Sequence, residues 1–369
     1  MGGAQPMTKT YPLTAHGLTT INVNADVGPN QDVSVWLTAG APFTAERSMY
    51  FRAADGTSGG TDVMGTAELE TSWYFAEGST ASGFDETLVL LNLNLDREAT
   101  AAITYYLTGA PAKTVWHTVP ALGRLSLSVN DANEAGSWPA VAMSVVADIP
   151  ILAERNMAFK FGGITGAHSL VGSPAPATSL NLAEGHVGGG FDEYLALLNP
   201  NDDSAAATIT YVIPGSPARQ QTVQLAGASR TTLHLNDVIP GNVDCAIQID
   251  ADLPITAERV SYFALPGFGS SGGDATIAVP SSALSREVTF AGHAAQSRDY
   301  FSVFNPGPDA ASVTFSYPMP AGPVSTTVTV PGRSRFTQAA GTDARGLQGA
   351  ATVSATVPVL VERASYFAY

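Results

Sequence analysis

The sequence has little cysteine, little charge and no long apolar run. Its 369 residues include one cysteine, Cys245, which excludes an intrachain disulfide and a zinc site built from several cysteines. No segment approaches the roughly 18 consecutive apolar residues that a membrane helix requires, and the opening MGGAQPMTKT lacks the hydrophobic core of a signal peptide. We therefore expect a soluble chain without membrane insertion, stabilised by packing alone.

Charged residues amount to 13 % of the chain, about half of the usual share, whereas 45 % of the residues are apolar. This composition excludes a coiled coil and a charge-rich disordered protein. With 32 acidic and 17 basic residues the net charge is −15, so the electrostatic field repels phosphate backbones and anionic lipid surfaces. Nucleic acid is not expected as a partner.

What the chain does contain is an internal repeat with a period of about 105 residues. A Glu-Arg dipeptide occurs four times, at separations of 108, 104 and 104 residues, and a proline precedes each glutamate by four positions. The dipeptides are Glu46-Arg47, Glu154-Arg155, Glu258-Arg259 and Glu362-Arg363. A further arginine recurs as Arg124, Arg230 and Arg335. The repeat predicts four domains: a half repeat at 8–51, which matches the second half of a unit, and whole units at 72–159, 180–263 and, in degenerate form, 286–369.

The segments between these units, 52–71, 160–179 and 264–285, are rich in glycine, serine and proline. Such composition is typical of linkers or long surface loops. Each segment also contains a related glycine-containing string, GGTDVMG, TGAHSLVG or GGDATIAVP. We expect a short strand after the glycines in each string.

Apolar residues alternate with a period of two inside the units, as over residues 33–37 and 141–145. Helical periodicity is missing, and threonine, valine, tyrosine and isoleucine fill the apolar segments as strand formers do. The pattern predicts an all-β chain of tandem immunoglobulin-like β-sandwich repeats, each with seven or eight strands, joined by Gly/Ser/Pro-rich linkers. A Greek-key jelly roll fits the same pattern, because alternation does not specify the order in which strands pair.

The strings WYFAEG (73–78), GFDEYLALLNPN (190–201) and AERSMYF (45–51) resemble a repeat found in secreted, multi-copy proteins of actinobacteria and related bacteria, to which no activity is assigned. The resemblance covers nearly the whole chain. It weakens in the last unit, where Val288 and Ala291 replace the tryptophan and the glutamate of the first string. The resemblance implies an extracellular or cell-surface setting.

The Glu-Arg dipeptides are the most regular polar feature of the sequence. Neighbouring residues on a strand face opposite sides, so Glu154 and Arg155 cannot both point into one unit. We expect these pairs to hold each unit closed, with Arg124, Arg230 and Arg335 as candidate partners of the glutamates. A repeated binding site for an anionic ligand is the alternative.

Paired acidic residues recur at Asp85-Glu86 and Asp192-Glu193. Two neighbouring carboxylates could bind calcium or hydrolyse a glycoside. We favour a charged strand edge, which opposes edge-to-edge aggregation, because an enzyme seldom needs the same site twice. No nucleophile motif or phosphate-binding loop occurs, so we predict no catalytic residue and no cofactor apart from calcium as a candidate ligand of these four residues.

Two functional hypotheses follow. The first is a non-enzymatic extracellular structural or adhesive protein, such as a stalk, fibre or surface-layer component, whose partners are copies of itself or other surface proteins. The second is an array of carbohydrate-binding modules at the cell wall or an exopolysaccharide.

The half repeat at 8–51 leaves an inner face and an edge uncovered. A neighbouring chain could supply the missing strands and so form polymers by strand complementation. A half repeat would also arise if the chain were a fragment, or if half-units were the true folding elements.

Overall fold

The computed structural model describes residues 6–15, 17–52, 58–292, 297–319, 322–340 and 350–366, so the predicted half repeat and last unit lie partly outside the described residues. The regular structure in these ranges is almost entirely β-strand, which confirms the all-β class. The described helical elements are short: α1 (Val23–Val27), α2 (Leu235–Val238) and 3-10 turns at Pro266–Phe268 and Ser281–Ala283. No helix in the described ranges has the length and apolar character to cross a membrane.

The first unit, residues 70–171, consists of two four-stranded antiparallel sheets that share one long strand. Its strands are β3 (Glu70–Phe75), β4 (Phe84–Asn92), β5 (Ala99–Leu107), β6 (Lys113–Val119), β7 (Gly123–Ser128), β8 (Val141–Phe161) and β9 (Ile164–Val171). The first half of β8 lies between β3 and β5, and β6 pairs with β5. The second half lies between β4 and β9, and β7 pairs with β4.

The long strand changes sheets at the proline that precedes each Glu-Arg dipeptide. In β8 this is Pro150, and the pairing with β3 shifts register at this point, between Glu70 and Ser72. A proline cannot donate a ladder hydrogen bond, so it is suited to this irregular stretch. Equivalent register shifts lie beside Pro254 and Pro358.

The second unit (177–280) follows the same pairing, and the third unit (285–366) follows it except that no described strand takes the place that β9 has beside β8. The second contains β10 (Ala177–Leu182), β11 (His186–Val187), β12 (Phe191–Asn199), β13 (Ala205–Val212), β14 (Arg219–Leu225), β15 (Ser229–His234), β16 (Val243–Asp244), β17 (Ala246–Leu265) and β18 (Ser270–Ile277). The short β19 (Val279–Pro280) pairs with β10 and so belongs to the second unit. The third contains β20 (Ser285–Phe290), β21 (Arg298–Asn305), β22 (Ala311–Tyr317), β23 (Val324–Val330), β24 (Ser334–Ala339) and β25 (Ala351–Tyr366). Here β17 and β25 are the long strands shared by two sheets.

The strand order agrees with an immunoglobulin domain only in part. The pairs β4–β7, β5–β8 and β8–β9 have counterparts in the B–E, C–F and F–G pairs of that fold, but here β4 also pairs with β8, whereas strands B and F of that fold lie in different sheets. However, β3 lies beside β8 rather than beside β4. The coarser description, two-layer β units built on a shared long strand, is the one that these pairings support.

The segments expected to be linkers contain sheet strands. β2 (Ser58–Met64) pairs with β1 (Glu46–Arg52), β9 pairs with β8, and β18 pairs with β17, each as a hairpin. β9 also contacts both β2 and β18. The short strands are therefore confirmed, and the linker prediction is wrong for these stretches because they belong to the packed structure.

Residues 17–45 contain no strand, although the alternation over 33–37 predicted one. In the first unit the equivalent part of β8 lies between β3 and β5, two strands that precede it. No strand occurs among the described residues before 33, so the backbone of residues 33–37 has no such preceding strands with which to form a hydrogen-bonded ladder. Val35, Trp36 and Leu37 are exposed instead.

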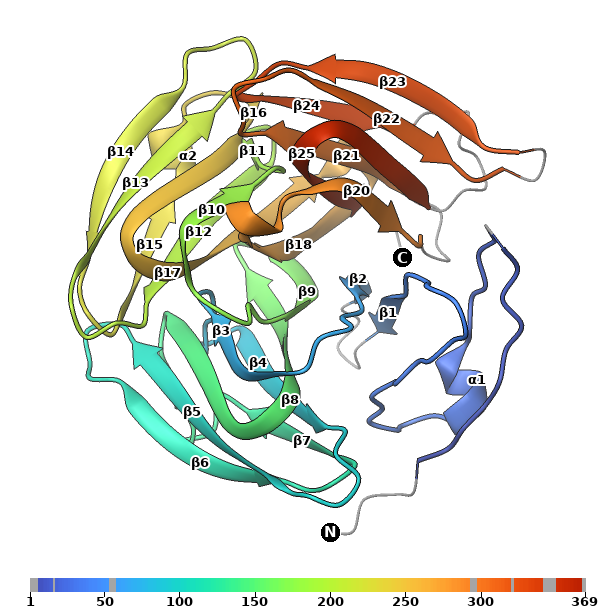
Figure 1. The fold of residues 1–369 in the computed structure, drawn as a ribbon. Helices are drawn as coiled ribbons and strands as arrows, with labels where there is room; N and C mark the ends of the chain where they lie inside the picture. The colour runs from blue at the N-terminus through green and yellow to red at the C-terminus, as the bar shows by residue number, and fades with distance from the viewer. Residues whose placement is uncertain are drawn as a thin grey trace.

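The three units and the N-terminal segment lie around a common centre, at which β2, β9 and β18 meet (Figure 1). The core of the first unit includes Val260, Tyr262 and Ala275 of the second. A smaller apolar cluster, in which Ala76 packs with Leu198, also joins these two units, and a similar cluster joins the second unit to the third. The units are thus packed against one another and are not strung on open linkers.

Candidate functional site

The Glu-Arg dipeptides lie in the long strands where one unit meets the next. Glu258 of β17 faces the first unit and its neighbour Arg259 faces the third, yet both side chains are buried. Their opposite directions agree with the alternation of a strand. Both are buried because the second unit has a neighbour on each side.

The Arg155 cluster, which consists of Arg155, Glu77 and Glu258, joins the first unit to the second. Arg155 Nη2 lies 2.9 Å from Glu77 Oε2, and Arg155 Nη1 lies 3.0 Å from Glu258 Oε2. The other oxygen of Glu258 accepts the backbone N–H of Ala76 at 2.6 Å. Burial would lower the pKa of Arg155, but Glu258 and Glu77 outweigh this effect and raise the pKa above its ordinary value. The buried guanidinium therefore stays charged between carboxylates of two units.

The Arg259 cluster, which consists of Arg259, Glu184 and Glu362, joins the second unit to the third. Arg259 Nη2 lies 2.7 Å from Glu184 Oε2, and Arg259 Nη1 lies 3.3 Å from Glu362 Oε2. Glu362 accepts the backbone N–H groups of Ala183 and Glu184 at 2.9 and 3.0 Å. The geometry is that of the Arg155 cluster, one unit further along the chain.

An equivalent contact joins the third unit to the N-terminal segment. Arg363 Nη2 lies 2.8 Å from Glu46 Oε2, and Glu46 Oε1 accepts the backbone N–H of Ala291 at 2.9 Å. Ala291 is the counterpart of Ala76 and Ala183, whose N–H groups also bond to a dipeptide glutamate. Gly292 therefore stands where the other units have Glu77 and Glu184, and the expectation that Ala291 replaces this glutamate is wrong. Asp62 of β2 lies 3.8 Å from Arg363. Two residues 317 positions apart in the sequence, Glu46 and Arg363, thus bring the first and the last described strands together.

Arg47 completes the circle by pairing with Glu154 of the first unit. Its two terminal nitrogens each donate to one carboxylate oxygen at 2.9 Å. Its side chain is 42 % exposed, whereas that of Arg155 is fully buried. In all four steps the arginine of one unit or segment meets the glutamate of the next, so the dipeptides hold units to each other. This corrects the expectation that they hold each unit closed.

The other recurring arginines also reach into the preceding unit or segment, and not to the glutamates of the dipeptides that we expected as partners. Their contacts are Arg124 with Asp32 (3.3 Å), Arg230 with the carbonyl of Gly78 (2.7 Å) and Arg335 with the carbonyl of Ala183 (2.7 Å). They reinforce the same interfaces.

The paired acidic residues point to opposite faces of β4 and β12. Asp85 is exposed, and Asp192 Oδ1 lies 2.6 Å from His234 Nε2. Glu86 and Glu193 are buried, and burial raises the pKa of Glu86 well above its ordinary value and that of Glu193 to about 8. Side chains on opposite faces do not share one ion, and no group of three or more His, Cys, Asp and Glu side chains in the described ranges could hold a metal. The geometry gives the calcium interpretation no support.

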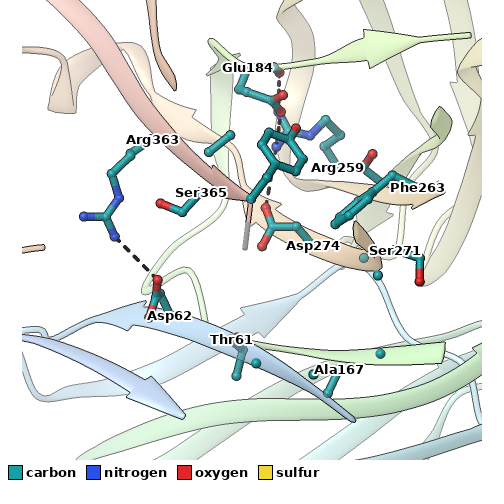
Figure 2. Close-up of a pocket in the computed structure, with 18 of the residues that line it drawn as sticks. Thr61, Asp62, Ala167, Glu184, Arg259, Phe263, Ser271, Asp274, Arg363 and Ser365 are labelled. Atoms are coloured by element: carbon teal, nitrogen blue, oxygen red, sulfur yellow. Dashed lines mark hydrogen bonds and ion pairs between the residues drawn. The ribbon is translucent and has the colours of Figure 1, made fainter. Parts of the chain in front are cut away.

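A pocket of about 380 Å³, here called the axial pocket, lies at the common centre of the ring that the three units and the N-terminal segment form. It is lined by β2, by β18 and by the last residues of β25 (Figure 2). The arginines that reach it are paired with acidic side chains, Arg363 with Asp62 at 3.8 Å and Arg259 with Asp274 at 3.9 Å. The pocket is therefore polar, with its positive groups balanced by carboxylates.

Sequence reasoning missed Glu77 and Glu184 as site residues. The available signal was the string AEG, which recurs in the first two units. The string did not reveal its partners, because each glutamate meets an arginine on a distant strand and lies beside a glutamate of the next unit.

Comparison with known proteins adds little. No protein-family model matches the chain, and no curated protein matches it. The solved structure "Crystal Structure of Thermotoga maritima 1070" is similar over 28 % of this chain and 94 % of that chain, with 18 % sequence identity and a TM-score of 0.27.

Proposed function

We propose that the protein is a non-enzymatic extracellular structural or adhesive protein, a component of a stalk, fibre or surface layer, made of tandem β-sandwich repeats. The observation that carries the proposal is the pairing of the recurring Glu-Arg dipeptides across units. A charged group engaged in a buried pair is costly to separate from its partner, so it is not available to a substrate. The extracellular setting rests on the resemblance of the repeated strings to those of secreted bacterial proteins.

Assembly into larger structures is expected at the N-terminal segment. Val35, Trp36 and Leu37 are 51, 63 and 44 % exposed and lie in a stretch, 17–45, that forms no strand. Adjacent exposed apolar side chains mark interaction surfaces. Strands from a second copy, or from another surface protein, would give this stretch both ladder partners and an apolar cover.

The experiment compares the mass of the purified protein by light scattering over about a 100-fold range of concentration, with electron microscopy of the largest species. The wild-type mass should rise with concentration. The double variant Trp36→Ser/Leu37→Ser should need roughly tenfold more protein to reach the same mass, which corresponds to about 1.4 kcal/mol of association energy. Trp116→Ser, which changes a 67 % exposed tryptophan of the first unit, is the matched control and should behave like wild type.

A constant monomer mass would contradict the assembly part of the proposal, and so would an equal effect of Trp116→Ser. The carbohydrate-binding alternative draws support from the same two exposed tryptophans, because sugar rings stack on exposed aromatic faces. Glycan-array binding that either tryptophan variant abolishes, without ligand-free assembly, would favour that alternative.

A further inference from the structure

His168 of β9 is a buried imidazole without a hydrogen-bond partner among the described residues. Its side chain belongs to a residue that is 1 % exposed, and neither ring nitrogen is bonded. Burying a polar group without a partner costs free energy, and burying the charged form of that group costs considerably more. Protonation of His168 therefore opposes the packing around it.

The imidazole faces the interface between the first unit and the second. Residues two positions apart on a strand share a face, so His168 lies on the same side of β9 as Gly166 and Leu170. A Cβ atom on Gly166 would lie 3.3 Å from Gly272 Cα of the second unit. Leu170 packs in one apolar cluster with Tyr262 of the same unit. Both units thus enclose His168.

The charged groups that act on His168 belong to the Arg155 cluster. Burial is the main reason that the pKa of His168 falls from an ordinary value near 6.5 to about 4, while Glu77 favours the protonated form and Arg155 opposes it. Tyr262 of β17 packs on the Phe159 ring beside His168, and burial raises the pKa of its phenol, so it is uncharged. Three further strands pack against β9, and the carboxylate that each brings to this region has an arginine partner: Glu258 of β17 with Arg155 (3.0 Å), Asp274 of β18 with Arg259 (3.9 Å) and Asp62 of β2 with Arg363 (3.8 Å).

The interface between the second and third units has an acidic residue at the equivalent position. The register places both His168 and Asp274 opposite the residue that follows the dipeptide glutamate by three positions. Asp274 lies 3.9 Å from Arg259, which is the counterpart of Arg155. A proton on Asp274 would remove a negative charge, whereas a proton on His168 adds a positive charge beside a buried guanidinium. Acid therefore acts differently on the two interfaces.

We propose that His168 makes the interface between the first and second units sensitive to acid, so that its protonation loosens this interface and leaves the one between the second and third units closed. Above about pH 6.5 neither the closed nor the open form binds the proton, and below it the open form binds the proton first. The opening constant should rise by up to tenfold per pH unit in this range, and by roughly 20-fold from pH 7 to pH 5. This device is independent of the N-terminal surface proposed for assembly.

Two backbone amides report the two interfaces separately. The N–H of Ala76 donates across the first interface to Glu258, and the N–H of Ala183 donates across the second to Glu362. Burial raises the pKa of both glutamates, so their protonation affects the two amides alike. A difference between the two amides therefore belongs to a group that only one interface contains.

The test measures hydrogen exchange of the full chain at pH 7 and pH 5, expressed as protection factors, which correct for the intrinsic pH dependence of exchange. Protection should fall roughly 20-fold at Ala76. It should not fall at Ala183, because the histidine of that interface, His186, is bonded to Asp244, which raises its pKa, and acid favours its closed form.

Variants separate His168 from the other titrating groups. His168→Leu replaces the imidazole by a side chain of similar size and loses no hydrogen bond, so its protection at Ala76 should be equal at the two pH values. His168→Gln removes the titration in the same way and serves if the leucine variant folds poorly. His234→Gln changes a partly exposed histidine of the second unit and is the matched control, which should keep the wild-type response.

The ratio of protection factors within one protein is the quantity compared, so a variant that is less stable at both pH values still gives a valid result. Equal protection at Ala76 at the two pH values in the wild type, a fall that persists in His168→Leu, or an equal fall at Ala183 would each overturn the proposal. Titration of the His168 ring protons at pH 6.5 or above in the folded protein, followed by NMR, would overturn it as well.

Discussion

Two adjacent residues of opposite charge, Glu258 and Arg259, are both buried in this molecule. The alternation of a strand correctly predicts that the two side chains face opposite sides. For a single unit, however, it implies that one of the two sides faces solvent. In a ring of packed units the second side is the next unit, so Glu258 meets Arg155 and Arg259 meets Glu362. The sequence pattern therefore identifies the important residues, whereas their burial depends on a neighbour that the pattern of one unit does not contain.

Loss of a buried arginine should be far more costly than loss of an exposed one. Arg155→Ala leaves the carboxylates of Glu77 and Glu258 buried without their cation, and we expect the free energy of unfolding to fall by about 3–5 kcal/mol. Arg47→Ala removes a bidentate pair of similar length whose arginine is 42 % exposed, and it should cost no more than about 1 kcal/mol. Urea unfolding followed by tryptophan fluorescence measures both. A cost below about 1 kcal/mol for Arg155→Ala would contradict the role assigned to the cluster.

The buried carboxyl of Glu193 should make the protein less stable as the pH rises. Burial raises its pKa from an ordinary value near 4.5 to about 8. Between these pH values the folded chain holds a proton that the unfolded chain has lost. The contribution of Glu193 to the free energy of unfolding therefore declines with rising pH, by at most about 1.4 kcal/mol per pH unit.

Glu193→Gln removes this titration and should flatten the decrease in unfolding free energy between about pH 5 and pH 8, as measured by urea unfolding at each pH. Asp85→Asn, which changes the exposed carboxyl of the equivalent pair, is the matched control. An unchanged slope in Glu193→Gln would show that Glu193 is already ionised in the folded protein.

At the level of strands, the sequence predicted local features well. The alternation predicted the strand class. The asparagines at the ends of β4, β12 and β21, which are Asn92, Asn199 and Asn305, each bond to a carbonyl four or five residues ahead. Two element predictions were wrong for opposite reasons. Residues 33–37 alternate but have no strands to pair with, and the glycine-rich segments look like linkers but have partners on both sides.

The glycine of β9 allows us to test whether these segments are packed strands. Gly166→Ala places a methyl group 2.8 Å from Phe159 Cζ and 3.3 Å from Gly272 Cα, and it should cost about 1–3 kcal/mol of unfolding free energy. Gly40→Ala is the control, because a Cβ atom there would meet nothing within 4 Å, and its effect should stay within about 0.5 kcal/mol of zero. Thermal or urea unfolding distinguishes the two. A flexible linker would tolerate both substitutions equally.

For the whole molecule, the decisive contacts join residues that no local pattern connects. The repeat reveals that Glu46 and Glu362 are equivalent, but not that Arg363 meets Glu46 rather than a glutamate of its own unit. The apolar cores also join residues that no local pattern connects, since Tyr262 of the second unit lies in the core of the first. Units with such interfaces should not unfold one at a time, unlike domains joined by flexible linkers.

Removing the contact between the first and last described strands should loosen both of them and spare the middle of the chain. The side chain of Glu46 is only 2 % exposed, and Glu46→Ala removes the carboxylate that lies 2.8 Å from Arg363 and that accepts the N–H of Ala291. Hydrogen exchange should become roughly 100-fold faster at the amides of β1 and of residues 360–366, corresponding to about 3 kcal/mol, while β12 and β13 keep their wild-type rates. Arg97→Ala, which breaks an exposed pair with Asp148 inside the first unit, should change neither region. If Glu46→Ala accelerated exchange in β1 alone, the third unit would be stable without its contact to the N-terminal segment. The Glu46–Arg363 ion pair would then not be what holds the third unit and the N-terminal segment together.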